Sequence, residues 1–183
     1  MTDEIVSPYK EMELNTRVAV HPRQLCTRLE ESIRTNLRSL EGRCVAQGNV
    51  RKVLKVLYFD NGAVPAEDME RKAYFNVRFS AVVCNPVVGT LLVMTIKKVD
   101  LSFVFSENGP VVGYTHVSTP ESRLTVKNGF VFTADGSGYQ QGDQVVTRVL
   151  ASRVLKGEKN VQVFCTIVRG IDSEASKQYI EGM

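Results

Sequence analysis

Few residues in this 183-residue chain have the types and spacing that catalysis requires. The two histidines, His21 and His116, have no serine, cysteine or carboxylate partner in a recognisable motif, so no nucleophile–base pair is predicted. Glu67, Asp68 and Glu70 form a short acidic run, which most simply indicates a solvated loop and not a metal site. No glycine-rich loop ends in a lysine. The sequence therefore predicts no catalytic residue, no metal site and no cofactor.

The four cysteines also lack the spacing of a metal or redox site. They are Cys26, Cys44, Cys84 and Cys165, and none forms a Cys-x-x-Cys pair or has a histidine at ligand spacing. We therefore expect reduced, mostly buried thiols in a cytosolic or nuclear protein. The N-terminus lacks the pattern of a secretory signal, and the apolar runs are shorter than the roughly 20 residues of a membrane helix.

The charge balance limits the class of partner. The chain has 23 Lys+Arg against 20 Asp+Glu, a formal net charge of +3. This is not the strongly basic composition of a protein that grips duplex DNA alone. Its 43% hydrophobic residues are typical of a globular protein. We expect any nucleic-acid binding to be local and weak, or shared with other subunits.

The first half of the chain predicts a small α+β unit. Residues 9–20 alternate and predict a strand. Pro22 suits the first turn of a helix, and apolar residues recur every three or four positions after it, which predicts a helix over residues 22–40. Residues 43–59 predict two short strands around a turn, or one strand with a bulge. Residues 73–83 predict a strand with one apolar face, formed by Phe75, Val77, Phe79, Ala81 and Val83.

The second half predicts a small all-β barrel, because short strands alternate with polar turns. The predicted strands are residues 90–99, 101–106, 111–117, 129–134, 144–154 and 160–169. Pro86 cannot donate to a sheet and ends the preceding strand, and Gly89 allows a turn into the barrel. We therefore expect two domains, residues 1–84 and residues 85–183, held at a fixed angle by a short joint.

The segment "FNVRFSAVVCNPVVGTLLVMTI" closely resembles the domain junction of the stalk subunit of multi-subunit RNA polymerases. This family comprises the seventh subunit of RNA polymerase II and the E subunit of archaeal polymerase. The resemblance runs from about Glu13 to Gly170, and the closing segment is similar to the stalk-like subunit of poxviruses and related large DNA viruses. The matching junction residues are Phe75, Val77, Arg78, Phe79, Ala81, Val82, Val83, Pro86 and Gly89.

The resemblance implies an OB-fold barrel and a non-catalytic role. In the family, the first domain docks on the polymerase core near the clamp, and the barrel lies beside the path of nascent RNA and supports initiation. The implied partners are the large polymerase subunits, nascent RNA and, in cellular enzymes, a helical stalk subunit. No membrane and no small-molecule substrate is implied. The implied location is the nucleus for a cellular protein, and the host cytoplasm and virion for a viral one.

The resemblance also suggests two sets of site residues. The docking candidates are Gln47, Gly48, Asn49 and Val50, although a plain turn explains a glycine and an asparagine equally well. The RNA-binding candidates are Lys97, Lys98, His116, Arg148 and Arg153.

Aromatic side chains on the barrel are predicted to contribute little to RNA binding. Leu101 and Val104 stand where strong RNA-binding relatives have aromatic residues, and Phe103 and Phe105 are interpreted as core. We therefore expect weak, salt-sensitive RNA contact, with an ordinary mixed barrel surface as the alternative. A free-standing RNA-binding protein of translation or RNA decay is the main rival function. An enzyme with an accessory barrel has no supporting residues.

Overall fold

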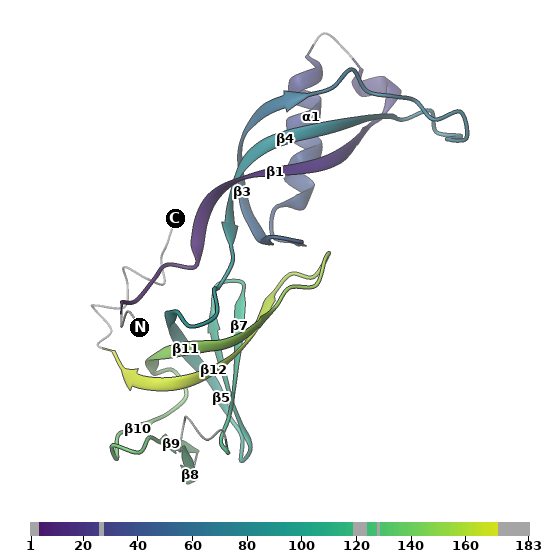
Figure 1. Ribbon diagram of the computed structural model, residues 1–183. Helices are drawn as coiled ribbons and strands as arrows, with labels where there is room; N and C mark the ends of the chain where they lie inside the picture. Colours follow the sequence, from purple (N-terminus) through teal and green to yellow (C-terminus); the bar gives the residue numbers. More distant parts are fainter. Residues whose placement is uncertain (1–3, 26–27, 119–123, 128, 172–183) are drawn as a thin grey trace.

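The computed structural model describes residues 4–25, 28–118, 124–127 and 129–171. Figure 1 shows two units placed end to end: a four-stranded sheet with one α-helix, and a barrel. Within these ranges, no helix is long and apolar enough to cross a membrane. The predicted fold class, an α+β unit followed by an OB-type barrel, is confirmed.

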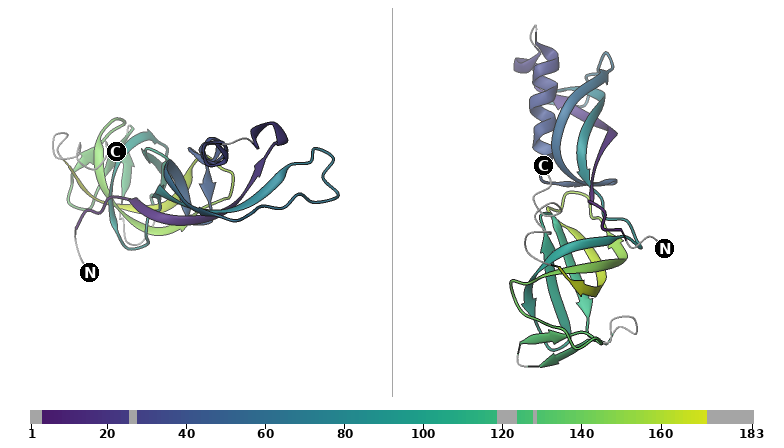
Figure 2. Two further views of the ribbon diagram at one scale, coloured as in Figure 1. Left: turned by 90° about the horizontal axis from the view of Figure 1, so that it is seen from above. Right: turned by 90° about the vertical axis from the view of Figure 1, so that its left-hand side faces the viewer.

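The sheet of the first unit is antiparallel, with strand order β1-β4-β3-β2. Helix α1 lies against one face of this sheet (Figure 2). The element bounds are β1 Tyr9–Val20, α1 Leu29–Leu37, β2 Cys44–Val45, β3 Gly48–Phe59 and β4 Ala73–Cys84.

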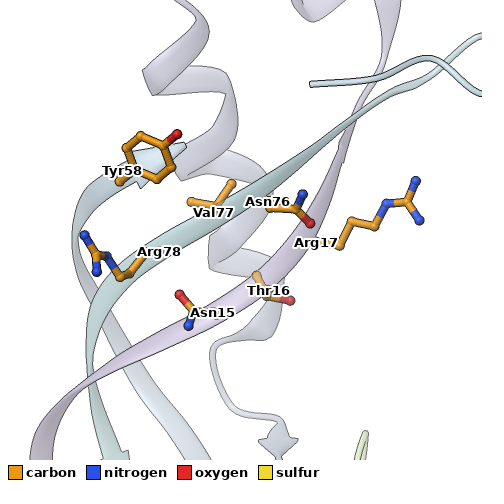
Figure 3. A pocket seen from close by; sticks show the side chains of 7 residues that line it. All are labelled: Asn15, Thr16, Arg17, Tyr58, Asn76, Val77 and Arg78. Carbon is orange, nitrogen blue, oxygen red and sulfur yellow. The ribbon is translucent and has the colours of Figure 1, made fainter. Parts of the chain in front are cut away.

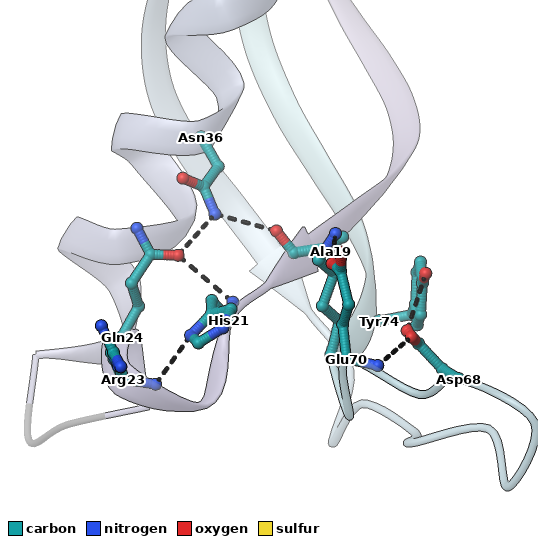
Figure 4. A network of polar contacts seen from close by, with 9 residues as sticks. Ala19, His21, Arg23, Gln24, Asn36, Asp68, Glu70 and Tyr74 are labelled. Carbon is teal, nitrogen blue, oxygen red and sulfur yellow. Dashed lines mark hydrogen bonds and ion pairs between the residues drawn. The ribbon is translucent and has the colours of Figure 1, made fainter.

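The predicted helix over residues 22–40 is interrupted. Pro22–Gln24 form a 3₁₀ turn that His21 caps: the Arg23 N–H donates to its Nδ1 (3.3 Å), and its own N–H donates to Gln24 Oε1 (3.2 Å) (Figure 4). Asn36 of α1 donates to Ala19 O at the end of β1 (2.9 Å). These bonds fix the entry turn and then tie α1 to the sheet, so a separate turn precedes the regular helix.

Strand β3 places an apolar residue on the core side at every third position. Register shifts interrupt its pairing with β4 three times, so Val50, Val53, Val56 and Phe59 each lie opposite a core-facing residue of β4. Each β-bulge inserts one extra residue into β3, so the next apolar side chain again faces the core. The five predicted apolar residues of β4 are all buried, as expected.

The second unit is a closed barrel with strand order β11-β12-β7-β6-β5. Strands β12 and β7 are parallel, and the other pairs are antiparallel. The barrel strands are β5 Leu91–Val99, β6 Phe103–Asn108, β7 Val111–His116, β11 Gln144–Arg153 and β12 Val161–Gly170.

The predicted strand at residues 129–134 exists but is not part of the barrel. It is β9 (Phe130–Phe132), which lies between β8 (Thr125–Lys127) and β10 (Gly138–Tyr139) in a separate three-stranded sheet. The sequence pattern does not predict β8 and β10, because strands of two or three residues are too short to show alternation.

The two units meet through more than the joint after β4. The joint itself turns at Gly89, where φ is +87° and the N–H donates to Val149 O (2.7 Å). A second contact joins the β2–β3 hairpin to the loop before β12: Cys44 exchanges backbone hydrogen bonds with Gly157 and Glu158 (2.8 and 2.7 Å). In addition, Ile5 forms a parallel bridge with Leu91 of β5.

Candidate nucleic-acid interface

The buried thiols of the described cysteines are poor nucleophiles. Burial raises the pKa of Cys84 to about 12, and it also raises the pKa values of Cys44 and Cys165. These thiols therefore stay protonated near neutral pH. Cys26 lies outside the described residues. In the part of the chain that the structure describes, no three His, Cys, Asp or Glu residues are grouped so that they could hold a metal ion.

Strand β6 presents its aromatic side chains to the outside of the barrel. Val104, Ser106 and Asn108 are buried and face the interior, so the alternation of a strand turns Phe103 and Phe105 outward, where both are half-buried. The prediction that Phe103 and Phe105 belong to the core is therefore wrong. Alternation separates the two faces of a strand, but it does not show which face is inside.

The neighbouring strands extend this surface. Phe103 lies opposite His116 and Phe105 opposite Tyr114 on β7, and Tyr114 lies opposite Phe164 on β12. The ring centroids are 4.7 Å apart for Phe103 and His116, 5.4 Å for Phe105 and Tyr114, and 6.2 Å for Tyr114 and Phe164. We call these five side chains the aromatic face. Phe164 is 51% exposed, so its ring is open to a ligand.

An apolar groove of about 620 Å³ runs along the aromatic face. Its lining combines aromatic rings with a few polar groups and one guanidinium. Exposed rings beside a cation are the combination that stacks bases and holds a phosphate in single-stranded nucleic acids. The lining residues are Phe103, Phe105, Tyr114, Ala151, Ser152, Arg153, Gln162 and Phe164.

The structure brings three of the five predicted RNA-binding residues to the aromatic face. Arg153 lines the groove, and the ring of His116 packs against Phe103. The Nζ of Lys98 lies 5.9 Å from the Phe105 ring centroid and 2.8 Å from Asp100 Oδ2.

The other two predicted residues lie away from the groove lining. Lys97 pairs with Glu107 (3.6 Å), and Arg148 is half-buried on β11. Tyr114 and Phe164 are not among the predicted site residues, although the structure places both in the groove lining. A signal was present in the tripeptide Phe103–Phe105, whose two rings share one strand face.

The predicted docking residues are divided between the surface and the contact with the barrel. Gln47 is exposed at the tip of the β2–β3 hairpin, whereas Gly48, Asn49 and Val50 are buried. The Asn49 amide donates to Lys159 O of the barrel (2.8 Å). Three of these four residues therefore have a structural role within the chain.

The predicted junction residues lie at different places along the chain. Arg78 is exposed on β4, and Phe79 is 1% exposed in the core of the first unit. Pro86 is buried in the joint, and Gly89 makes the turn that leads into β5.

Comparison with known proteins adds one relative. A protein of Acanthamoeba polyphaga mimivirus, provisionally named as a DNA-directed RNA polymerase subunit, is 20% identical over 177 residues. The match covers 94% of this chain and 88% of the relative, so it includes both the sheet unit and the barrel. No protein-family model matches the chain. The resemblance to polymerase subunits is thus confirmed as distant, near-full-length homology with a giant-virus protein.

Proposed function

From its homology to a viral RNA polymerase subunit, we propose that this chain is a non-catalytic stalk subunit of a DNA-dependent RNA polymerase. The supporting observation is the extent of the match, which spans both structural units and not the barrel alone. In this proposal, residues 1–84 dock on the polymerase core and residues 85–183 reach toward RNA or transcription factors. The polymerase large subunits are the partners, and the viral relative favours the host cytoplasm and virion over the nucleus.

The aromatic face supports a role for the barrel in holding nascent RNA. Its rings offer sequence-tolerant stacking, which suits an RNA whose sequence varies with the gene that is transcribed. Arg153 lies in the same groove and can bind a phosphate. This surface makes RNA contact a stronger expectation than the basic residues alone do.

The end of the sheet unit farthest from the barrel supports a docking role. The loop between β3 and β4 projects there (Figure 1), and Met69 in this loop is 99% exposed. Asp68 orders the loop by accepting hydrogen bonds from the Glu70 N–H (2.9 Å) and the Tyr74 hydroxyl (3.1 Å) (Figure 4). An ordered loop that exposes a flexible apolar side chain is suited to insertion into an apolar pocket. Gln47, at the hairpin nearer the barrel, is the second docking contact.

Substitution of Met69 tests the docking part of the proposal. Met69→Glu places a charge where an apolar contact is expected, so it should reduce recovery of the large polymerase subunits with the tagged chain at least tenfold. Leu101→Glu is the matched control, because Leu101 is 85% exposed and belongs to the barrel unit. Equal recovery with both variants would show that the Met69 loop does not dock.

A free-standing RNA-binding protein is the second candidate, and the aromatic face also favours it. A protein of this kind would bind and act on RNA in the cell without being part of a polymerase. It leaves the near-full-length homology to a polymerase subunit unexplained. Co-purification separates the two functions, since only a polymerase subunit recovers the large subunits.

A further inference from the structure

The face of the sheet opposite α1 carries a polar pocket, distinct from the apolar groove of the barrel. Its volume is about 610 Å³. Figure 3 shows the side chains that line it. Its side chains come from three neighbouring strands, β1, β4 and β3. The lining residues are Asn15, Thr16, Arg17, Tyr58, Asn76, Val77 and Arg78.

The strand register sets the spacing of the two arginines. Asn15 lies opposite Arg78, and Arg17 lies opposite Asn76, so each arginine has an asparagine directly across the strand pair. Diagonal neighbours of this kind are about 7–8 Å apart in an antiparallel pair. Tyr58 of β3 lies on the other side of Arg78 and is 59% exposed. Two cations, two amides and an exposed ring therefore lie within one pocket.

Among the described residues, no ion pair neutralises the charge of the pocket. No carboxylate lines it, and neither Arg17 nor Arg78 has an ion-pair partner in the described ranges. The Arg17 guanidinium lies 4.5 Å from the centroid of the Tyr74 ring, which fixes its position. Asp60 lines an adjoining pocket together with Arg17 and accepts hydrogen bonds from the Asn76 side-chain amide (2.6 Å) and backbone N–H (3.0 Å).

We propose that this pocket binds the phosphodiester backbone of single-stranded RNA, as a site separate from the barrel groove. Guanidinium groups bind phosphates through paired hydrogen bonds, and Arg17 and Arg78, whose side chains extend to opposite sides of the pocket (Figure 3), can each hold one phosphate of the same strand. Tyr58 offers a ring for stacking a base. The choice of RNA rests on the proposed function, whereas the anion site rests on the pocket alone.

The amides favour RNA over DNA. Asn15 and Asn76 can each donate and accept hydrogen bonds, as can a ribose 2′-hydroxyl. An acidic peptide would also satisfy the arginines, but it would leave the exposed Tyr58 ring without a flat partner. The single-stranded RNA backbone therefore fits the pocket better.

Salt dependence provides the primary test. The full chain is titrated with a fluorescent oligouridine across a range of salt concentrations. The double variant Arg17→Gln/Arg78→Gln should lower the slope of log K against log [salt] by about 1.4, since each phosphate contact on a single strand contributes about 0.7. A matched control, Arg17→Lys/Arg78→Lys, keeps both charges and should keep most of the slope. An unchanged slope in the glutamine variant overturns the proposal.

A barrel variant separates this site from the aromatic face. Phe164→Ala should weaken RNA binding without changing the salt slope, because it removes a ring and no cation. If Phe164→Ala abolishes binding and the arginine variant does not, RNA binds at the barrel only and the sheet site is disproved.

Competition and crosslinking test the choice of ligand. The RNA should outcompete a DNA oligonucleotide of equal length, and polyglutamate should not displace it. Crosslinking with 4-thiouridine RNA should label Tyr58, Tyr74 or their neighbours. Equal competition by DNA or by polyglutamate would overturn the assignment to RNA.

Discussion

Gly48 provides a direct test of whether the β2–β3 hairpin has a structural or a docking role. A Cβ at Gly48 would lie 2.4 Å from the Cys84 carbonyl oxygen and 2.9 Å from Val83 Cγ1. The φ angle is +138°, which side chains other than glycine rarely adopt. Because a backbone atom makes the closest contact, relief requires that β3 and β4 move apart. Gly48→Ala should therefore destabilise the fold itself.

The expected loss is large for one methyl group. Overpacking costs about 1–3 kcal/mol, and a strained backbone conformation costs about 1–3 kcal/mol, so the sum is roughly 2–6 kcal/mol. For a chain of this size, each kcal/mol lowers the Tm by about 2–4 °C, which predicts a decrease of roughly 4–24 °C.

The assay is thermal unfolding followed by circular dichroism. Gly136→Ala is the matched control, because Gly136 has φ +82° but open space around it, so only the backbone term applies. A Tm for Gly48→Ala within 2 °C of the wild-type value would refute the packing argument. If such a stable variant also failed to recover polymerase, Gly48 would be a docking residue and not a structural one.

Three further predictions concern the barrel, the buried thiol and the joint. Phe164→Ala should weaken oligouridine binding by about 5- to 150-fold in fluorescence anisotropy, since stacking contributes about 1–3 kcal/mol per base; an effect no larger than that of Val64→Ala, a loop residue of similar exposure (56%), would contradict a stacking role. Burial raises the pKa of Cys84 from 9.0 to about 12, so the unfolded chain loses this proton first as the pH rises. Cys84 should add nothing to the pH dependence of the free energy of unfolding below pH 9, and should lower that free energy by about 1.4 kcal/mol per pH unit above it. In urea titrations, the slope for Cys84→Ala should therefore be shallower than the wild-type slope by this amount, while Cys44 and Cys165 keep their own contributions. Pro86→Ala combined with Gly89→Ala should misdirect the two units, and full activity of a stalk-depleted polymerase supplied with this variant would disprove a rigid joint.

The elements with a regular period were predictable from the sequence. Strand β1 occupies residues 9–20 as predicted, because its core-facing side chains alternate without interruption. The alternation of apolar residues likewise predicts β4 and its buried face. Strand β3 repeats every three residues because of its bulges, and period-two reasoning does not anticipate a bulge.

The aromatic face could not be assigned from the sequence because the size of the barrel interior was unknown. A Cβ at Gly113 would lie 2.6 Å from Ser106 Oγ and 2.8 Å from Met94 Cε, so the interior between β5, β6 and β7 is already full. Ser106 fits this space, whereas a phenylalanine ring would not. The larger residues of β6 therefore face outward, against the usual preference of phenylalanine for the core.

The polar pocket on the sheet was also hidden from sequence reasoning. Arg17 and Arg78 are separated by most of the first unit along the chain, and only the β1–β4 register makes them neighbours. Arg78 matches the family junction in sequence, but only the fold shows that its side chain is exposed on the sheet surface.

The central claim is that this chain is an RNA polymerase subunit, and affinity purification from the native source tests it most directly. The tagged chain is purified at moderate salt, and the co-purifying proteins are identified and quantified by mass spectrometry. Our account predicts that the large polymerase subunits are recovered in near-equal amounts with the chain. Recovery of RNA with ribosomal or decay proteins, and no polymerase subunit, would contradict it and support a free-standing RNA-binding protein.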